Sequence, residues 1–104
     1  MRTHGKVDLN QANIVRALRK VGCSVQSLSS VGNGCPDLLV AFQMRWFLLE
    51  VKSAKGKLTS QQQDWNHRMC GPVYIVRDVA EALLVLGFEL PESRQVEEIQ
   101  RLKR

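Results

Sequence analysis

The 104-residue chain lacks long apolar runs and has few aromatic residues. Its longest apolar stretches, at residues 38–42 and 82–86, are far below the roughly 18 residues that a membrane-spanning helix needs. No apolar segment follows the charged N-terminus, so we expect no secretion signal and a cytoplasmic protein. Repeats and low-complexity tracts are also absent. The 44% apolar and 24% charged residues are therefore expected to form one small globular domain.

The chain contains few cysteines, and their spacing does not match a known pair motif. The three residues Cys23, Cys35 and Cys70 are odd in number and far apart. Together with His4 and His67 they form neither a Cys-x-x-Cys nor a His-x-x-x-His pair, so we expect no zinc site. Reduced, partly buried thiols are the simplest prediction for them.

Acidic residues are outnumbered by basic ones. Fifteen Lys and Arg against ten Asp and Glu give a net charge of +5 and an isoelectric point near 9.5. This balance favours a polyanionic partner, with nucleic acid first and an anionic membrane surface second. Small basic proteins without an acidic partner are also common, so charge alone leaves the question open.

Hydrophobic spacing and capping residues predict seven elements in the order α-β-β-β-α-β-α. The first helix is expected to begin with Asp8 as its N-cap and to bury Ile14 and Leu18. The other predicted elements are strands at 23–29, 37–42 and 46–51, a helix at 59–69, a strand at 73–76 and a helix at 79–86. This order predicts a small α/β domain with a mixed sheet.

The two middle strands are apolar on both faces, which predicts that helices cover them on both sides. Residues 1–90 are assigned to the domain. From residue 91 the composition becomes highly charged, and residues 91–104 are expected to form a tail that could be an amphipathic helix.

Three charged residues, Asp37, Glu50 and Lys52, stand in these otherwise apolar strands. Charged side chains are rarely buried unless they are paired or bind a metal. Strand alternation places Glu50 and Lys52 on one face. Asp37 joins them if the hairpin pairs it with Glu50, with a loop at Gln43-Met44 or at residues 42–45. A register shifted by one residue would put Asp37 on the other face.

If the three side chains converge, they suit metal-assisted hydrolysis of a phosphodiester. Mg²⁺ takes oxygen ligands in octahedral geometry, and Asp37, Glu50 and the backbone carbonyl of Val51 would supply them. The metal lowers the pKa of a bound water, and Lys52 would orient that water or stabilise developing negative charge. The alternative is a structural ion pair between Lys52 and one of the carboxylates.

Three ordered motifs surround these residues: GNGCPDLLV at 32–40, LLEVKS at 48–53 and GKLT at 56–59, followed by Gln62 or Gln63 and by Trp65. Together they closely resemble the virus-type replication-repair nuclease (VRR-NUC) family of the PD-(D/E)XK nuclease superfamily, over most of the chain. The resemblance implies a restriction-endonuclease-like fold, with Asp37 and Glu50 as metal ligands and Lys52 as the catalytic lysine. It also implies Mg²⁺ or Mn²⁺ and activity on structured DNA such as four-way (Holliday) junctions or flaps, often in phage or prophage.

One feature departs from the family pattern. Many relatives carry a glutamate on the first helix that helps to hold the metal, and this chain has no Glu before Glu50. Asp8, Asn10 and Gln11 are the nearest substitutes. Asp8 could instead be an N-cap, and Asn10 could hold a metal-bound water.

Basic residues near the expected metal predict a DNA-binding surface. Lys55 and Lys57, close to Lys52, would contact phosphates, which adds affinity without sequence preference. The alternative is an ordinary solvated loop. By resemblance, Gln62 or Gln63 would approach the site or the DNA backbone. Four other basic residues could flank this surface: Lys6, Arg16, Arg19 and Arg68.

These observations predict a Mg²⁺-dependent, structure-specific DNA endonuclease acting on four-way junctions or related branched DNA. Two alternatives stay open: a junction-binding module that does not cut, and a restriction-like duplex endonuclease, for which the chain has little room to read bases. Because a junction has near two-fold symmetry and each chain offers one active site, a C2 homodimer is expected. The candidate interface residues are Trp46, Phe47, Met69 and Phe88, with Val96, Ile99 and Leu102 in the tail.

Overall fold

The computed structural model describes residues 5–89, and for residues 5–8 it describes the backbone alone. It contains the seven predicted elements in the predicted order. They are α1 (Gly5–Lys20), β1 (Ser24–Ser27), β2 (Leu38–Phe42), β3 (Arg45–Val51), α2 (Ser60–Met69), β4 (Tyr74–Val76) and α3 (Val79–Val85). The tail predicted at residues 91–104 lies outside this range. Of the helices described, none is long and apolar enough to cross a membrane.

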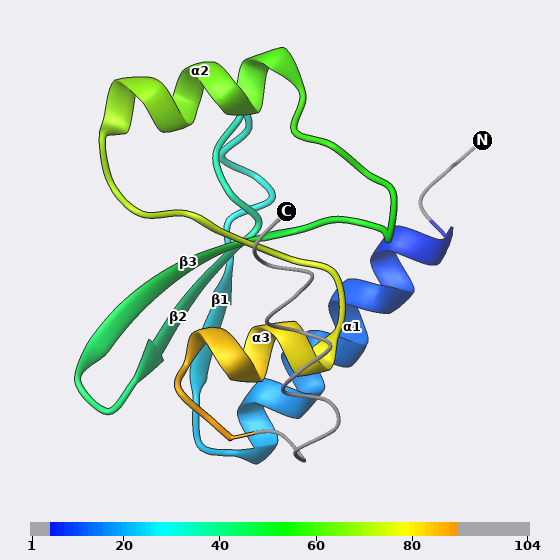
Figure 1. Cartoon of the computed structure of the whole chain (residues 1–104), viewed down its shortest axis with the longest axis vertical. Helices are drawn as coiled ribbons and strands as arrows, with labels where there is room; N and C mark the ends of the chain where they lie inside the picture. The colour runs from blue at the N-terminus through cyan, green and yellow to red at the C-terminus, as the bar shows by residue number, and fades with distance from the viewer. Residues whose placement is uncertain (1–4, 90–104) are drawn as a thin grey trace.

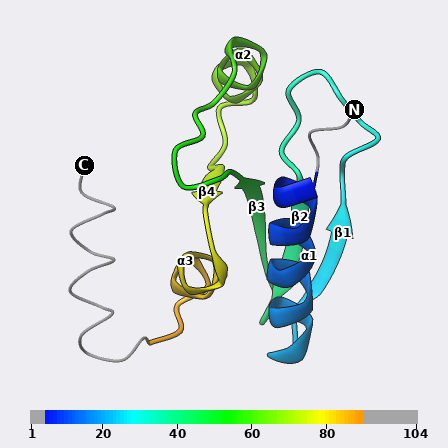
Figure 2. The ribbon, with the colours of Figure 1, turned by 90° about the vertical axis from the view of Figure 1, so that its right-hand side faces the viewer.

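The sheet is mixed, as predicted. Its strand order is β1-β2-β3-β4, with antiparallel pairs β1–β2 and β2–β3 and a parallel pair β3–β4. A parallel pair needs a long crossover, and the segment that contains α2 supplies it. Figures 1 and 2 show α2 at the end of the molecule where β3 ends, away from α3.

The β2–β3 hairpin has the register that brings the predicted site together. Leu38 pairs with Leu49 and Phe42 with Arg45, so one further step of the same register places Asp37 beside Glu50. The turn consists of Gln43 and Met44, which have φ angles of 51° and 64°. Positive φ at both central residues is typical of the type I′ turns that suit the twist of a hairpin.

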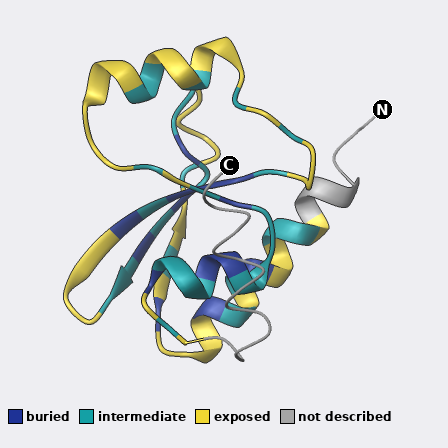
Figure 3. Ribbon diagram, viewed as in Figure 1, coloured by how far each residue is buried: buried dark blue, intermediate teal, exposed yellow. Residues whose placement is uncertain are grey.

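Helices α1 and α3 pack against each other and against one face of the sheet. The core between them and the sheet contains Ile14, Leu18, Leu38, Val40, Phe47, Leu49, Val51, Val76, Ala82 and Leu86. In Figure 3 the buried segments of the strands and of these helices meet in this layer. The alternation of side chains along each strand explains why Val40 and Phe47 face the helices.

The prediction that helices cover both faces of the middle strands is wrong. Residues between the core positions point to the opposite, open face, where Leu39 pairs with Leu48 and Ala41 with Trp46. Trp46 is 72% exposed there. Among residues 5–89, the two helices that pack on the sheet share the other face. The apolar character of both faces therefore reflects cross-strand packing on the open side rather than a second helical layer.

Of the aromatic interface candidates, Phe47 belongs to the core, where it is 7% exposed. Its ring also lies 6.1 Å from that of Tyr74, measured between centroids. Phe88 is partly buried and packs on Phe42 at 5.2 Å. Trp46 and the Met69 side chain are exposed.

The helix starts follow the capping prediction in part. Thr59 caps α2 in a full capping box with Gln62. Asp78 caps α3 by accepting from the Glu81 N–H, while the Glu81 carboxylate accepts from Arg77 N–H. The prediction for α1 is wrong, because the helix begins at Gly5 and Asp8 lies inside it rather than at its cap.

Candidate active site

Adjacent strands bring the predicted acidic residues to the same end of the sheet. Asp37 immediately precedes β2, and Glu50 and Val51 end β3. The Val51 N–H donates a hydrogen bond of 2.8 Å to Asp37 Oδ2. This bond fixes the Asp37 carboxylate beside β3, as the favourable register predicts.

Glu50 is the most enclosed polar group of the site. Its side chain is 4% exposed, and Lys52 Nζ lies 3.7 Å from its Oε2. The same oxygen accepts a 2.9 Å hydrogen bond from Gln62 Nε2. Burial first, and then the negative charge of Asp37, raise the pKa of Glu50 to about 7, while Lys52 acts in the opposite direction. Asp37, Glu50 and Lys52 therefore form one interacting cluster.

The structure distinguishes between the two candidate glutamines. Gln62 Oε1 accepts from the Thr59 N–H at 2.9 Å, so its side chain completes the capping box with one end and reaches Glu50 with the other. Gln63 is exposed and donates to the Leu58 carbonyl. Gln62 thus links the start of α2 to the acidic cluster, and Gln63 does not approach it.

The glycine-containing loop before Asp37 contacts α2 closely. Gly34 has a φ of 85°, and a Cβ at this position would collide with the backbone carbonyl of Gln61. A side chain here would push the loop and the helix apart. The absence of a side chain at Gly34 therefore lets the backbone of α2 approach this loop closely.

Arg77 is a residue of the site that the sequence analysis missed. Its Nη1 donates to the carbonyls of Ser53 and Gly56, both at 2.8 Å. These bonds hold the β3–α2 loop, which carries Lys55 and Lys57, against the end of β4. The one sequence signal for Arg77 is its position directly after an apolar strand. That position does not indicate which groups its side chain contacts.

The first-helix candidates contribute differently from the prediction. Asn10 Nδ2 donates to the Arg77 carbonyl at 3.0 Å and so ties α1 to the end of β4. Its amide nitrogen is engaged in this structural contact, and its role toward a metal-bound water stays a prediction. The Asp8 side chain lies outside the described part of the structure.

The basic residues lie near the acidic cluster but differ in exposure. Lys52 is 15% exposed and faces Glu50. Lys55 and Lys57 are exposed on the loop that follows β3. The predicted DNA-binding lysines are therefore on the surface next to the candidate site, and their contacts with DNA stay a prediction.

Asp37 and Glu50 have the chemistry that Mg²⁺ or Mn²⁺ requires. Two neighbouring carboxylates, one of them buried, repel each other, and a divalent cation between them would favour their ionised forms. Burial, followed by the charges of Glu50 and Asp37, also raises the pKa of the Cys35 thiol. Among residues 9–89, whose side chains the structure describes, no cluster of three or more His, Cys, Asp or Glu suited to a metal occurs. The remaining ligands would be water, phosphate and the Val51 carbonyl, which is a common arrangement for Mg²⁺.

Comparison with known proteins identifies the fold. A solved structure described as a VRR_NUC domain matches with a TM-score of 0.65 and 24% sequence identity, covering 80% of this chain and 98% of the other. No protein-family model and no curated protein matches the chain. The chain therefore has the fold of the VRR_NUC domain, which confirms the fold implied by its sequence motifs.

Proposed function

We propose that the chain is a nuclease that uses Mg²⁺ or Mn²⁺ to hydrolyse phosphodiester bonds in branched DNA, with four-way junctions as its main substrates. The observation that carries this proposal is the cluster formed by Asp37, Glu50 and Lys52. A solved domain of the same fold that is described as VRR_NUC supports it. The net charge of +5 is consistent with a polyanionic substrate.

Each residue of the cluster has a distinct role in this proposal. Asp37 and Glu50 would hold the metal, whose charge lowers the pKa of water and offsets the charge of the phosphate. Gln62 fixes the orientation of Glu50 through its 2.9 Å hydrogen bond. The Lys52 ammonium group stabilises the negative charge that develops on the phosphate oxygens.

The 3.7 Å contact between Lys52 and Glu50 also fits the rival proposal, a DNA-binding module in which this is a structural ion pair. Two adjacent carboxylates weaken that alternative, because they repel phosphate and so reduce the affinity of a module that only binds.

Cutting a junction symmetrically requires two active sites, and we propose that a C2 homodimer supplies them. Trp46 on the open sheet face remains a candidate for its interface. It lies four residues from Glu50 along β3, which corresponds to about 13 Å. A contact at this end of the face would leave the acidic cluster accessible to DNA.

The proposal is tested with purified protein and three labelled substrates: a four-way junction, a flap and a linear duplex. Each is incubated with Mg²⁺ or with EDTA, and the products are separated by size. We expect cleavage of the branched substrates with Mg²⁺ alone. Binding of the junction without cleavage in either Mg²⁺ or Mn²⁺ would favour the non-cleaving module, and equal cleavage of all three substrates would contradict structure specificity.

A further inference from the structure

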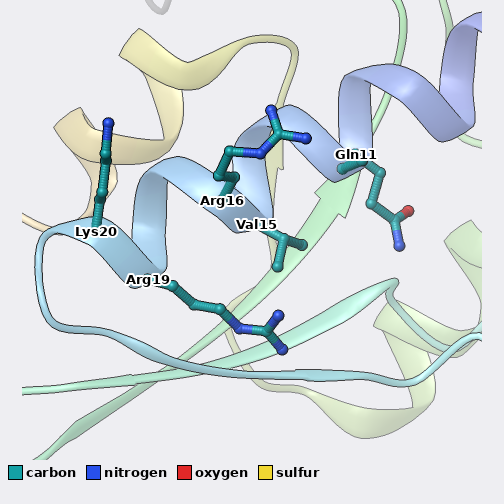
Figure 4. Close-up of a pocket in the computed structure, with 6 residues that line it drawn as sticks. Gln11, Val15, Arg16, Arg19 and Lys20 are labelled. Atoms are coloured by element: carbon teal, nitrogen blue, oxygen red, sulfur yellow. The ribbon is translucent and has the colours of Figure 1, made fainter.

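A second basic surface runs along α1, outside the candidate active site. Arg16, Arg19 and Lys20 are exposed and form what we call the α1 basic stripe. They border a surface hollow of about 660 Å³ that is also lined by Gln11, Ala12 and Val15. Figure 4 shows these side chains extending from consecutive turns of the helix.

The charges of the stripe are not neutralised within the described part of the chain. The ion pairs found there join Lys52 to Glu50 and Arg68 to Asp64. Arg16 donates instead to the Asn13 side-chain oxygen at 3.0 Å and Arg19 to the Val25 carbonyl at 3.1 Å. These neutral acceptors position the guanidinium groups, and among residues 9–89 no carboxylate forms an ion pair with them.

The helix dipole favours Arg19 and Lys20 in the last turn of α1, but the spacing of Arg16 and Lys20 acts against the helix. Arg16 and Lys20 are four residues apart, and like charges at this spacing destabilise a helix by a few tenths of a kcal/mol. An anionic partner along the helix would offset this repulsion. A phosphate backbone supplies such charges in a row.

The stripe and the candidate active site belong to one connected unit. The Lys52 N–H donates to the Val76 carbonyl at 3.0 Å, and Asn10 donates to the carbonyl of the next residue, Arg77. The first part of α1 is thus held near Lys52. From Asn10 to Lys20 the helix axis rises about 15 Å, which corresponds to about four base pairs of DNA at 3.4 Å each.

We propose that the α1 basic stripe binds the DNA phosphate backbone several base pairs from the bond cut at the candidate active site. This inference rests on the proposed nuclease function. Lysine and arginine contacts with phosphates carry no sequence information, so the stripe adds affinity that depends on the length of the DNA arm. DNA that ends within about four base pairs of the cut would not reach it.

The test compares R16A/K20A with the charge-preserving control R16K/K20R, both in an E50Q background that prevents cleavage in Mg²⁺. Arg19 is left unchanged because it contacts β1, and alanine maintains the helix. Affinity is measured by fluorescence anisotropy for junctions with long and with short arms. We expect E50Q and the control to bind long arms more tightly than short ones, and R16A/K20A to lose this difference.

The salt dependence gives a second expected result. Each phosphate contact contributes about 0.9 to the slope of log affinity against log salt. Between 50 and 200 mM salt, the control should therefore lose about tenfold more affinity for long arms than R16A/K20A does. Equal affinity and equal slopes for the two variants would overturn the inference.

The outcomes separate this inference from the proposed function. If the wild-type chain cuts junctions and R16A/K20A keeps the full effect of arm length, the inference alone is wrong. If the wild-type chain neither binds nor cuts DNA of any length, both proposals fail. Loss of binding to anionic phospholipid vesicles in R16A/K20A, with DNA binding intact, would assign the stripe to a membrane surface and overturn the inference.

Discussion

At the scale of single residues, Glu50 combines burial with a negatively charged neighbour. Its side chain is 4% exposed and its pKa is raised to about 7, first by burial and then by Asp37. An unfolded chain has no such environment, so this carboxyl group keeps its ordinary pKa near 4.5 there. The sequence predicted that Glu50 and Lys52 share a face, but it contained no information about how deeply the Glu50 side chain is buried.

The raised pKa makes the stability of the metal-free protein depend on pH. Below pH 4.5 Glu50 is protonated in both states, and as the pH rises toward 7 the unfolded chain releases this proton before the folded one does. Glu50 should therefore destabilise the fold progressively over this interval, by about 3 kcal/mol in total. The measurement is urea unfolding in EDTA at pH 5 and pH 8, and E50Q should lack this contribution. The same pH dependence in wild type and E50Q would show that Glu50 is not its source.

Gln62 and Gln63 form a matched pair of adjacent residues with different contacts. Q62A removes the hydrogen bond to Glu50 and half of the capping box. We expect it to lower the rate of junction cleavage about tenfold and stability by about 1 kcal/mol. Q63A should leave cleavage close to the wild-type rate. Similar cleavage by both variants, measured at saturating DNA, would be inconsistent with an orienting role for Gln62.

At the scale of elements, the β2–β3 hairpin shows where sequence reasoning reaches its limit. The alternation of side chains along each strand left two possible registers for this hairpin. Both strands are apolar on both faces, so the hydrophobic pattern could not decide between the two registers. The turn residues Gln43 and Met44 adopt positive φ without the Asn-Gly signature that marks such turns. The register became clear from the structure, where Leu38, Val40, Phe47 and Leu49 share the core.

Arg77 connects elements that are distant in the sequence, which explains why its role was not predicted. Ser53 lies 24 residues away from it, and no local pattern indicates a hydrogen bond to a backbone carbonyl at that distance. The same reason hid the close contact between the loop at Gly34 and the start of α2.

Because Arg77 holds the loop that carries Lys55 and Lys57, R77A should weaken DNA binding without removing either lysine. We expect KM for junction DNA to rise several-fold while kcat stays within about twofold, and amide hydrogen exchange at residues 53–58 to accelerate. R68A removes an arginine that is paired with Asp64 on α2 and serves as the control for hydrogen exchange, because its ion-pair partner lies outside residues 53–58. Unchanged exchange in R77A would show that the loop does not depend on this residue.

At the scale of the whole molecule, the sheet has one covered and one open face. The open face includes a hollow lined in part by Leu39, Ala41 and Trp46. The fold class and element order followed from helix caps and hydrophobic spacing, because these signals are local. The open face could not be predicted, since which side of a sheet the helices cover depends on the path of the whole chain.

If the open face forms a C2 interface, light scattering at micromolar concentration should give a mass near twice 11.8 kDa. W46E should shift the mass toward the monomer, because it places a charge in the interface without disturbing the core. M44E, on the exposed turn of the same hairpin, is the control and should leave the dimer intact. A monomeric mass of the wild-type chain with and without junction DNA would exclude the dimer and favour single-strand nicking of flaps.

The most direct test of the central claim is single-turnover cleavage of a labelled four-way junction by the wild-type chain and by D37N, E50Q and K52A. With Mg²⁺ the wild-type chain should cut the junction, and each variant should be slower by at least about a hundredfold, since each loses a group that stabilises the transition state. Junction binding should be kept or strengthened in D37N and E50Q, because a charge that repels phosphate is removed. Cleavage by any of the three variants at a rate near that of the wild-type chain would contradict the role assigned to that residue.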